Sequence, residues 1–343
     1  MLDQRTLRFG RTGKISTDSF IKSFFEWEAV RYEVDIMCKE EPFTCPGCSP
    51  DMLAVSVDGN RKHYRFKNAA RSEEQAIFDG VFIARDEDVS RFVDYIHTTT
   101  KHVSGRVFHA KAHDFKCEVK WSGAYQEGTG LTLGEEVEQV NAFLSRIAVT
   151  TKHMSKAGRT DMLTLMAMRW NQQKVSNLAT SLSRRYLKTT KALEKQLQNL
   201  ESMKAELAVT EKQLEDWIRD VNEWTETTTN NPRDAAALAS KIEMLTLPNS
   251  DSFDLRTKRR AFDLVMAVKR LQEEKKILVI EMNHHWKVLS THSDSLKELS
   301  CLQNSPLGLS EDGMKGLQSM FRKKQHDIGE MKTHFFGGSS SRR

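Results

Sequence analysis

The chain has 343 residues, 38% hydrophobic and 29% charged, so it can hold two or three domains but is poor in apolar residues for one large core. Its formal net charge of +5 is too small to indicate nucleic-acid binding unless that charge is concentrated in one region. The polar, basic start predicts no secretory signal, and no apolar stretch approaches a membrane span. We therefore expect a reducing compartment, nuclear or otherwise cytoplasmic, and no membrane partner.

The first regular element is predicted to be a helix over residues 18–37. Thr17 and Asp18 offer an N-cap, and apolar residues follow at helical spacing. Such a face packs in a core more often than it binds a partner.

A cysteine-rich segment comes next. Cys45 and Cys48 have the C-x-x-C spacing that lets two thiolates bind one Zn²⁺ from a tight turn. His109 and His113 are four residues apart and would share one face of a helix. The four residues together predict a Cys2His2 zinc site, against the alternative of a metal-free C-x-x-C and two surface histidines. The spare ligands are Cys38 and Cys117.

Residues 52–67 read as a β-hairpin. An apolar run ends at Asp58, Asp-Gly is a turn signal, and the return strand alternates Tyr64 and Phe66 with polar residues. From this segment alone Asp58 is better explained as a turn residue than as a metal ligand. A third strand is predicted over residues 77–84.

A helix is predicted over residues 86–97. Three acidic residues suit its N-terminal dipole. Its apolar side is expected to be buried and consists of Val89, Phe92, Val93 and Ile96.

A glycine-containing loop over residues 116–134 precedes a long helical region. Glu135, Glu136 and Glu138 lie in the first turn of that region, where the simplest explanation is complementation of the helix dipole. Helical character continues to about Trp224, with a turn and restart predicted at residues 154–159.

The spacing sharpens into heptads over residues 193–221. One heptad position is apolar throughout, and the other carries two polar exceptions, Lys204 and Glu211. The pattern predicts a coiled coil that binds a second copy or another helix, with a long packed amphipathic helix as the alternative. A second long helix over residues 252–301 is long enough to fold back on the first.

Six short motifs, taken in order, resemble those of the Kyakuja-Dileera-Zisupton transposases. They are C-P-G-C with V-S-V-D-G-N, V-F-I-A-R-D-E-D-V-S-R-F-V, F-H-A-K-A-H-D-F-K-C, G-T-G-L-T-L-G-E-E-V-E and T-K-H-M-S-K-A-G-R-T-D-M-L-T. The resemblance covers residues 38–174, and the remainder is similar to the helical tail of animal members.

The resemblance implies a ribonuclease-H-like core in which three carboxylates hold two Mg²⁺ ions for DNA cleavage and strand transfer. Asp58 matches the first acid. Glu135 and Glu138 match two glutamates of the family, one of which should be the third acid. His109 and His113 match the family's paired histidines.

One departure affects the expected activity. In the family a long segment with the second catalytic Asp precedes the paired histidines, whereas here residues 103–106 make the connection directly. Two of three acids on a sheet without its central strands should not align two metals. We therefore expect a catalytically inactive protein, with Mg²⁺ binding not functional.

The expected fold class is α+β, with a truncated ribonuclease-H-like core, reduced to a three-stranded antiparallel remnant plus helices, followed by a mainly α, coiled-coil half. The expected boundaries are 1–50 for the helix and cysteine segment, 51–174 for the incomplete transposase domain, 175–302 for the helical tail and 303–343 for a weakly structured end. DNA is the expected partner of a transposase-derived protein. The alternatives are an interaction protein with no DNA role and an active transposase in which Asp79 or Asp94 replaces the lost acid.

Overall fold

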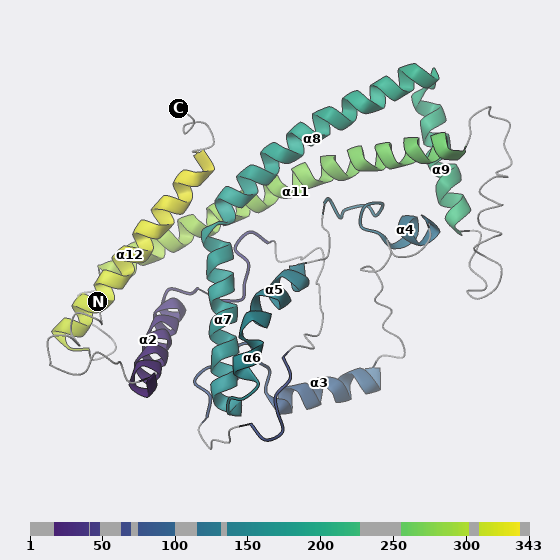
Figure 1. Ribbon diagram of the computed structural model, residues 1–343. Helices are drawn as coiled ribbons and strands as arrows, with labels where there is room; N and C mark the ends of the chain where they lie inside the picture. The colour runs from purple at the N-terminus through teal and green to yellow at the C-terminus, as the bar shows by residue number, and fades with distance from the viewer. Residues whose placement is uncertain are drawn as a thin grey trace.

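Two long antiparallel helices, α8 (Leu178–Leu207) and α11 (Leu255–Ser300), organise the molecule (Figure 1). The structure is a computed structural model that describes residues 17–40, 42–48, 63–69, 75–99, 115–131, 136–226, 255–301 and 309–336. Arg185 of α8 is paired with Glu274 of α11, whereas Leu200 lies further along α8 and packs near Val268. Residue numbers thus rise on one helix as they fall on the other.

The seam of α8 is covered by α11 of the same chain. Leu200 and Met203 are buried with Ala261 and Val268, and the partly buried Leu193 packs against the same cluster. Apolar residues seven apart bring one stripe of α8 onto one partner helix, so hydrophobic burial stabilises the pair.

The heptad region is not one continuous helix. α8 ends at Leu207, Ala208 has a left-handed backbone (φ 51°), and α9 (Glu211–Glu226) restarts in another direction (Figure 1). The side chain of Gln213 accepts a hydrogen bond from the N–H of Thr210 at 2.8 Å, which caps the new helix. The two polar heptad exceptions meet across this break, since Lys204 Nζ lies 2.8 Å from Glu211 Oε2.

The far end of α11 packs with helices from both ends of the chain. α2 (Thr17–Met37) contributes Val34, and Cys38 follows directly after it. α12 (Glu311–Phe336) contributes Phe321 and Ile328 to the same buried cluster, which also contains Leu296.

The predicted N-terminal helix is confirmed. The core role of its apolar face is not, because Phe20, Ile21 and Val30 are exposed and only Phe24 and Phe25 are partly buried.

The region before α8 is a group of shorter helices around α7 (Lys156–Ser176). α5 (Glu136–Leu144), the short 3-10 helix η2 (Ser145–Ile147) and α6 (Ala148–Thr151) precede it, and α5 packs on α7. The predicted restart is confirmed, because Ser155 caps α7 by accepting a hydrogen bond from Gly158 N at 3.2 Å. α4 (Phe115–Trp121) packs on α9.

The predicted α+β fold, with its ribonuclease-H-like three-stranded remnant, is wrong for the residues that the structure describes, which contain helices and turns but no strand. Residues 77–81 form a turn in which Val81 N donates to Phe78 O at 3.2 Å and Gly80 has a φ of 76°. The first strand of the hairpin lies outside the described residues.

The return segment at residues 63–66 is irregular because its polar groups bond to the turn between α6 and α7. Phe66 N donates to Lys152 O at 3.1 Å, and Arg65 Nε donates to Met154 O at 3.0 Å. Arg159, in the first turn of α7, also donates to His63 O. Residues 63–66 therefore form their hydrogen bonds with a turn between helices and with α7, and not with a neighbouring strand.

α3 (Asp86–Thr99) forms as predicted, but its apolar side is exposed. Phe92 is 63% exposed, and Val89, Val93 and Tyr95 are exposed as well. Burial of this side was therefore predicted wrongly for Val89, Phe92 and Val93. None of the helices in the described ranges is both long and apolar enough to cross a bilayer.

Candidate functional site

Of the three expected catalytic acids, the structure places one. Glu138 lies in α5 with an exposed side chain, whereas Asp58 and Glu135 lie outside the described residues. α5 is held on α7 partly by Phe143, whose ring centroid is 4.9 Å from that of Trp170. Because two of the three acids lie outside the described residues, the role predicted for them stays a prediction.

The glycine-containing loop over residues 122–131 is bound to α11. The N–H groups of Gly128 and Leu131 donate to Glu273 Oε2 and Glu274 Oε2 at 2.9 and 3.1 Å. Tyr125 extends the contact by donating its hydroxyl to Asp263 Oδ1 at 2.9 Å. Carboxylates of the helical tail thus satisfy the backbone donors of a loop that lies far before them in sequence.

Two of the loop's glycines adopt left-handed backbone conformations. Gly128 has a φ of 82° and Gly130 a φ of 56°. A Cβ at Gly130 would lie 2.8 Å from Glu274 Oε2, whereas one at Gly128 would meet no atom within 4 Å. Gly130 is therefore required both by its backbone and by its close approach to α11.

Charged groups complete the contact. Glu274 is 1% exposed and its Oε1 lies 2.6 Å from Arg185 Nη2, while Glu273 Oε1 lies 2.6 Å from the buried Arg270. Burial alone would raise the pKa of Glu273, but hydrogen bonds from Gly128 N and Arg270 lower the pKa below its ordinary value. Clustered N–H groups can bind anions, and here they hold the chain's own carboxylates.

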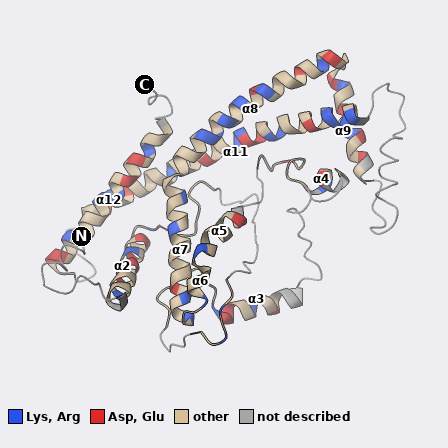
Figure 2. Ribbon diagram, in the orientation of Figure 1, with Lys and Arg blue, Asp and Glu red and all other residues tan. Residues whose placement is uncertain are grey.

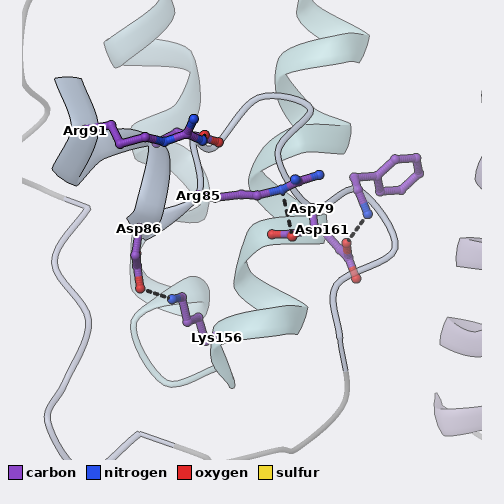
Figure 3. Close-up of polar contacts among 8 residues, drawn as sticks. Asp79, Arg85, Asp86, Arg91, Lys156 and Asp161 are labelled. Atoms are coloured by element: carbon purple, nitrogen blue, oxygen red, sulfur yellow. Dashed lines mark hydrogen bonds and ion pairs between the residues drawn. The ribbon is translucent and has the colours of Figure 1, made fainter.

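A second group of acids joins the turn at residues 77–81 and α3 to α7 (Figure 3). Asp161 of α7 is buried and accepts a hydrogen bond from Phe78 N at 2.9 Å. Burial raises the pKa of Asp161. Asp79 pairs with Arg85 at 3.3 Å, and Asp86 pairs with Lys156 at 2.5 Å. These acids are engaged in structural contacts.

Cys45 and Cys48 lie in a tight turn, with Cys48 N donating to Cys45 O at 3.3 Å. The turn rests on the start of α8 and on α11, since a Cβ at Gly47 would lie 3.3 Å from Leu178 and 3.9 Å from the carbonyl oxygen of Glu281.

The hydrogen bond donated by the Cys48 thiol lowers the pKa of Cys45 to about 6, with further support from backbone N–H groups and His284, although burial opposes this. The thiolate is the form that binds Zn²⁺, so Cys45 suits the metal. The same hydrogen bond, together with burial, raises the pKa of Cys48.

The other half of the predicted zinc site, His109 and His113, lies outside the described residues. Within the described ranges, no three or more His, Cys, Asp or Glu residues are arranged to hold a metal ion. The spare ligand Cys38 is buried among apolar residues of α2, α11 and α12, where burial raises its thiol pKa to about 11.

The family resemblance rests on one segment, which contains α4, the glycine loop, α5 and most of α7. Residues 102–171 match the family model of the Kyakuja-Dileera-Zisupton transposase. The match covers about a fifth of the chain, and we call these residues the KDZ-like segment. Neither a curated protein nor a solved structure matches the chain.

The sequence did not reveal the contact between the KDZ-like segment and α11. The glycines indicated a loop, but nothing in the sequence distinguished Glu273 and Glu274 from other charged residues of a helix. A contact between positions 145 residues apart has no local signal.

Proposed function

We propose that this is a transposon-derived protein that has lost DNA strand transfer and retains DNA binding. The KDZ-like segment supports the transposon-derived origin. The loss of activity and the DNA binding are our inferences, and they have separate tests.

The exposed apolar side of α3 carries the proposal of inactivity. The resemblance places the family's missing central segment, with its second catalytic Asp, directly after this helix. Phe92 and Tyr95 are 63% and 59% exposed. Large apolar side chains that share a face of an amphipathic helix ordinarily pack against other parts of the fold. If the segment that normally covers these side chains is absent, they would be left exposed, as they are here.

A nicking assay on supercoiled plasmid with Mg²⁺ or Mn²⁺ tests this proposal. We expect no cleavage above a buffer control. Metal-dependent cleavage that disappears in Asp58→Ala and Glu138→Ala would overturn it and establish an active transposase. Cleavage that persists in both variants would indicate a contaminating nuclease, which further purification removes before the assay is scored.

DNA binding is supported by the family of the matched segment, whereas the net charge of +5 is too small to support it alone. The competing function is an interaction protein whose heptad region binds another helix. That region already packs on α11, since Leu200 and Met203 are buried with Ala261 and Val268. Retention of the full chain on duplex DNA should fall steeply with salt, because phosphate neutralisation releases counterions. No salt-dependent retention would favour the interaction protein.

We also propose that Cys45 and Cys48 form half of a structural zinc site completed by His109 and His113. The lowered pKa of Cys45 supports the thiolate half. Bound zinc can be measured by elemental analysis of the purified protein. We expect about one Zn²⁺ per chain, lost in Cys45→Ser and in His109→Ala. Retention of zinc in His109→Ala and His113→Ala would assign the other ligands elsewhere.

A further inference from the structure

α8 carries an uninterrupted basic row on one face. Arg184, Lys188, Lys191 and Lys195 are spaced four, three and four residues apart, and all four side chains are exposed. At 100° per residue these positions lie within about 60° of one another around the helix, and at 1.5 Å per residue they span about 16 Å. We call these four residues the α8 basic row; blue bands recur along α8 in Figure 2.

The α8 basic row faces away from the rest of the helical pair. Of the five buried residues of α8, Ala179, Leu182, Thr189 and Leu200 lie roughly 130–150° around the helix from the centre of the row, and Met203 lies about 90° from it. α11 therefore covers the opposite side of α8 and leaves the row accessible along its full length.

No acid interrupts the row. The same face continues with the uncharged, exposed residues Ser181, Gln198 and Ser202. Among the described residues, none of the four basic side chains makes an ion pair. Some other exposed helical cations do so within one turn, as when Arg91 pairs with Asp88 and Lys315 with Glu311. Like charges one turn apart repel and destabilise a helix, so the arrangement carries a cost without a partner.

We propose that the α8 basic row binds the phosphate backbone of duplex DNA. This inference rests on the proposed DNA-binding function and assigns it to a surface outside the KDZ-like segment. A straight row of cations with neighbouring hydroxyl and amide groups fits a rigid, regularly spaced polyanion. Contacts to phosphates carry no sequence information, so we expect this binding to be independent of sequence.

The test uses the full chain with all four residues changed to Gln. Arg, Lys and Gln have similar helix propensities, so Arg184→Gln, Lys188→Gln, Lys191→Gln and Lys195→Gln should leave the helix intact. The control changes one Arg and three Lys that are also exposed and make no ion pair in the described part of the chain. They lie on α9, α11 and α12 and are Lys212, Lys287, Arg322 and Lys323. Both variants have the same net charge, and circular dichroism checks that both are folded.

Binding to a fluorescent duplex of random sequence is measured by anisotropy between 50 and 200 mM NaCl. We expect the slope of log K against log salt to become less steep by about 3 to 4 in the α8 variant, since each phosphate contact contributes about 0.9. The control variant should keep a slope within about 1 of the original.

The outcomes separate this inference from the proposed function. Duplex binding by the original protein with equal slopes in both variants would overturn the assignment to α8 alone. Absence of duplex binding by the original protein would overturn the proposed function and this inference with it. Row-dependent binding to phosphatidylserine vesicles without duplex binding would show that the row serves a membrane, which also overturns the inference.

Discussion

α11 and α3 are both amphipathic helices of this chain, but only α11 has its apolar side covered. Leu278 of α11 is completely buried, while Phe92 of α3 is 63% exposed. The apolar and polar sides are more sharply separated in α3 than in α11, so the exposure of α3 reflects what the rest of the chain supplies and not a weaker pattern. The helical tail contains both halves of its packing, whereas no described part of the chain covers the apolar side of α3.

The largest expected effect separates these two helices directly. Leu278→Ala should lower the free energy of unfolding by about 3 kcal/mol, because it leaves a cavity in a packed interior. Phe92→Ser should change it by less than about 0.5 kcal/mol, as is usual for exposed positions. Urea unfolding followed by circular dichroism measures both. Equal losses of free energy in the two variants would mean that Phe92 is buried in solution, contrary to the difference between α3 and α11.

The second prediction concerns pH and the packing of α11 on α12. His285 is completely buried near Phe335, and burial, with the charges of His284 and His292, lowers the pKa of His285 from 6.5 to about 4. A depressed pKa gives stability that is fully present above pH 6.5 and is lost as pH falls toward 4, by up to about 3 kcal/mol.

His285→Leu should flatten this part of the pH dependence of unfolding, whereas His326→Leu on the exposed side of α12 should not. A wild-type profile that stays flat between pH 6.5 and 4 would show that His285 is accessible to protons.

The third prediction tests whether α11 holds the glycine loop of the KDZ-like segment. Gly128→Ala should cost about 1 kcal/mol for the left-handed backbone alone. Gly130→Ala should cost at least about 2 kcal/mol, because its Cβ would also collide with Glu274. Thermal unfolding gives the difference between the variants. If both variants lose the same free energy of unfolding, the close approach of Gly130 to Glu274 does not contribute to stability.

The smallest effect is expected at the junction of α8 and α9. Thr210→Ala removes a hydroxyl that caps α9 together with Gln213 and should lower stability by about 1 kcal/mol. Thr190→Ala in α8, which removes a hydroxyl bonded within the helix, is a suitable control. If the two losses are the same, α9 does not depend on its cap.

The helices could be predicted because their apolar spacing is local. The predicted boundaries of α2 and α11 differ from the observed ones by at most a few residues. The break after Leu207 was missed although Thr210 and Gln213 form a capping box that the sequence displays. The seven-residue apolar repeat continued across the break and masked that signal.

The strands could not be judged from local pattern. β-Branched and aromatic residues predicted a strand over residues 77–84, but a strand requires a neighbouring strand for its hydrogen bonds. In the structure Phe78 N is bonded by Asp161, a residue 83 positions away. The contacts of the glycine loop could not be predicted for the same reason, because the residues that bind it lie far away in the helical tail.

The hydrogen bonds from the glycine loop to Glu273 and Glu274 have a consequence for folding during translation. The loop leaves the ribosome 145 residues before Glu273, so its backbone donors remain hydrated until the tail is synthesised. At ordinary translation rates this delay is on the order of ten seconds. The nascent KDZ-like segment must therefore wait for α11 before it can complete its fold.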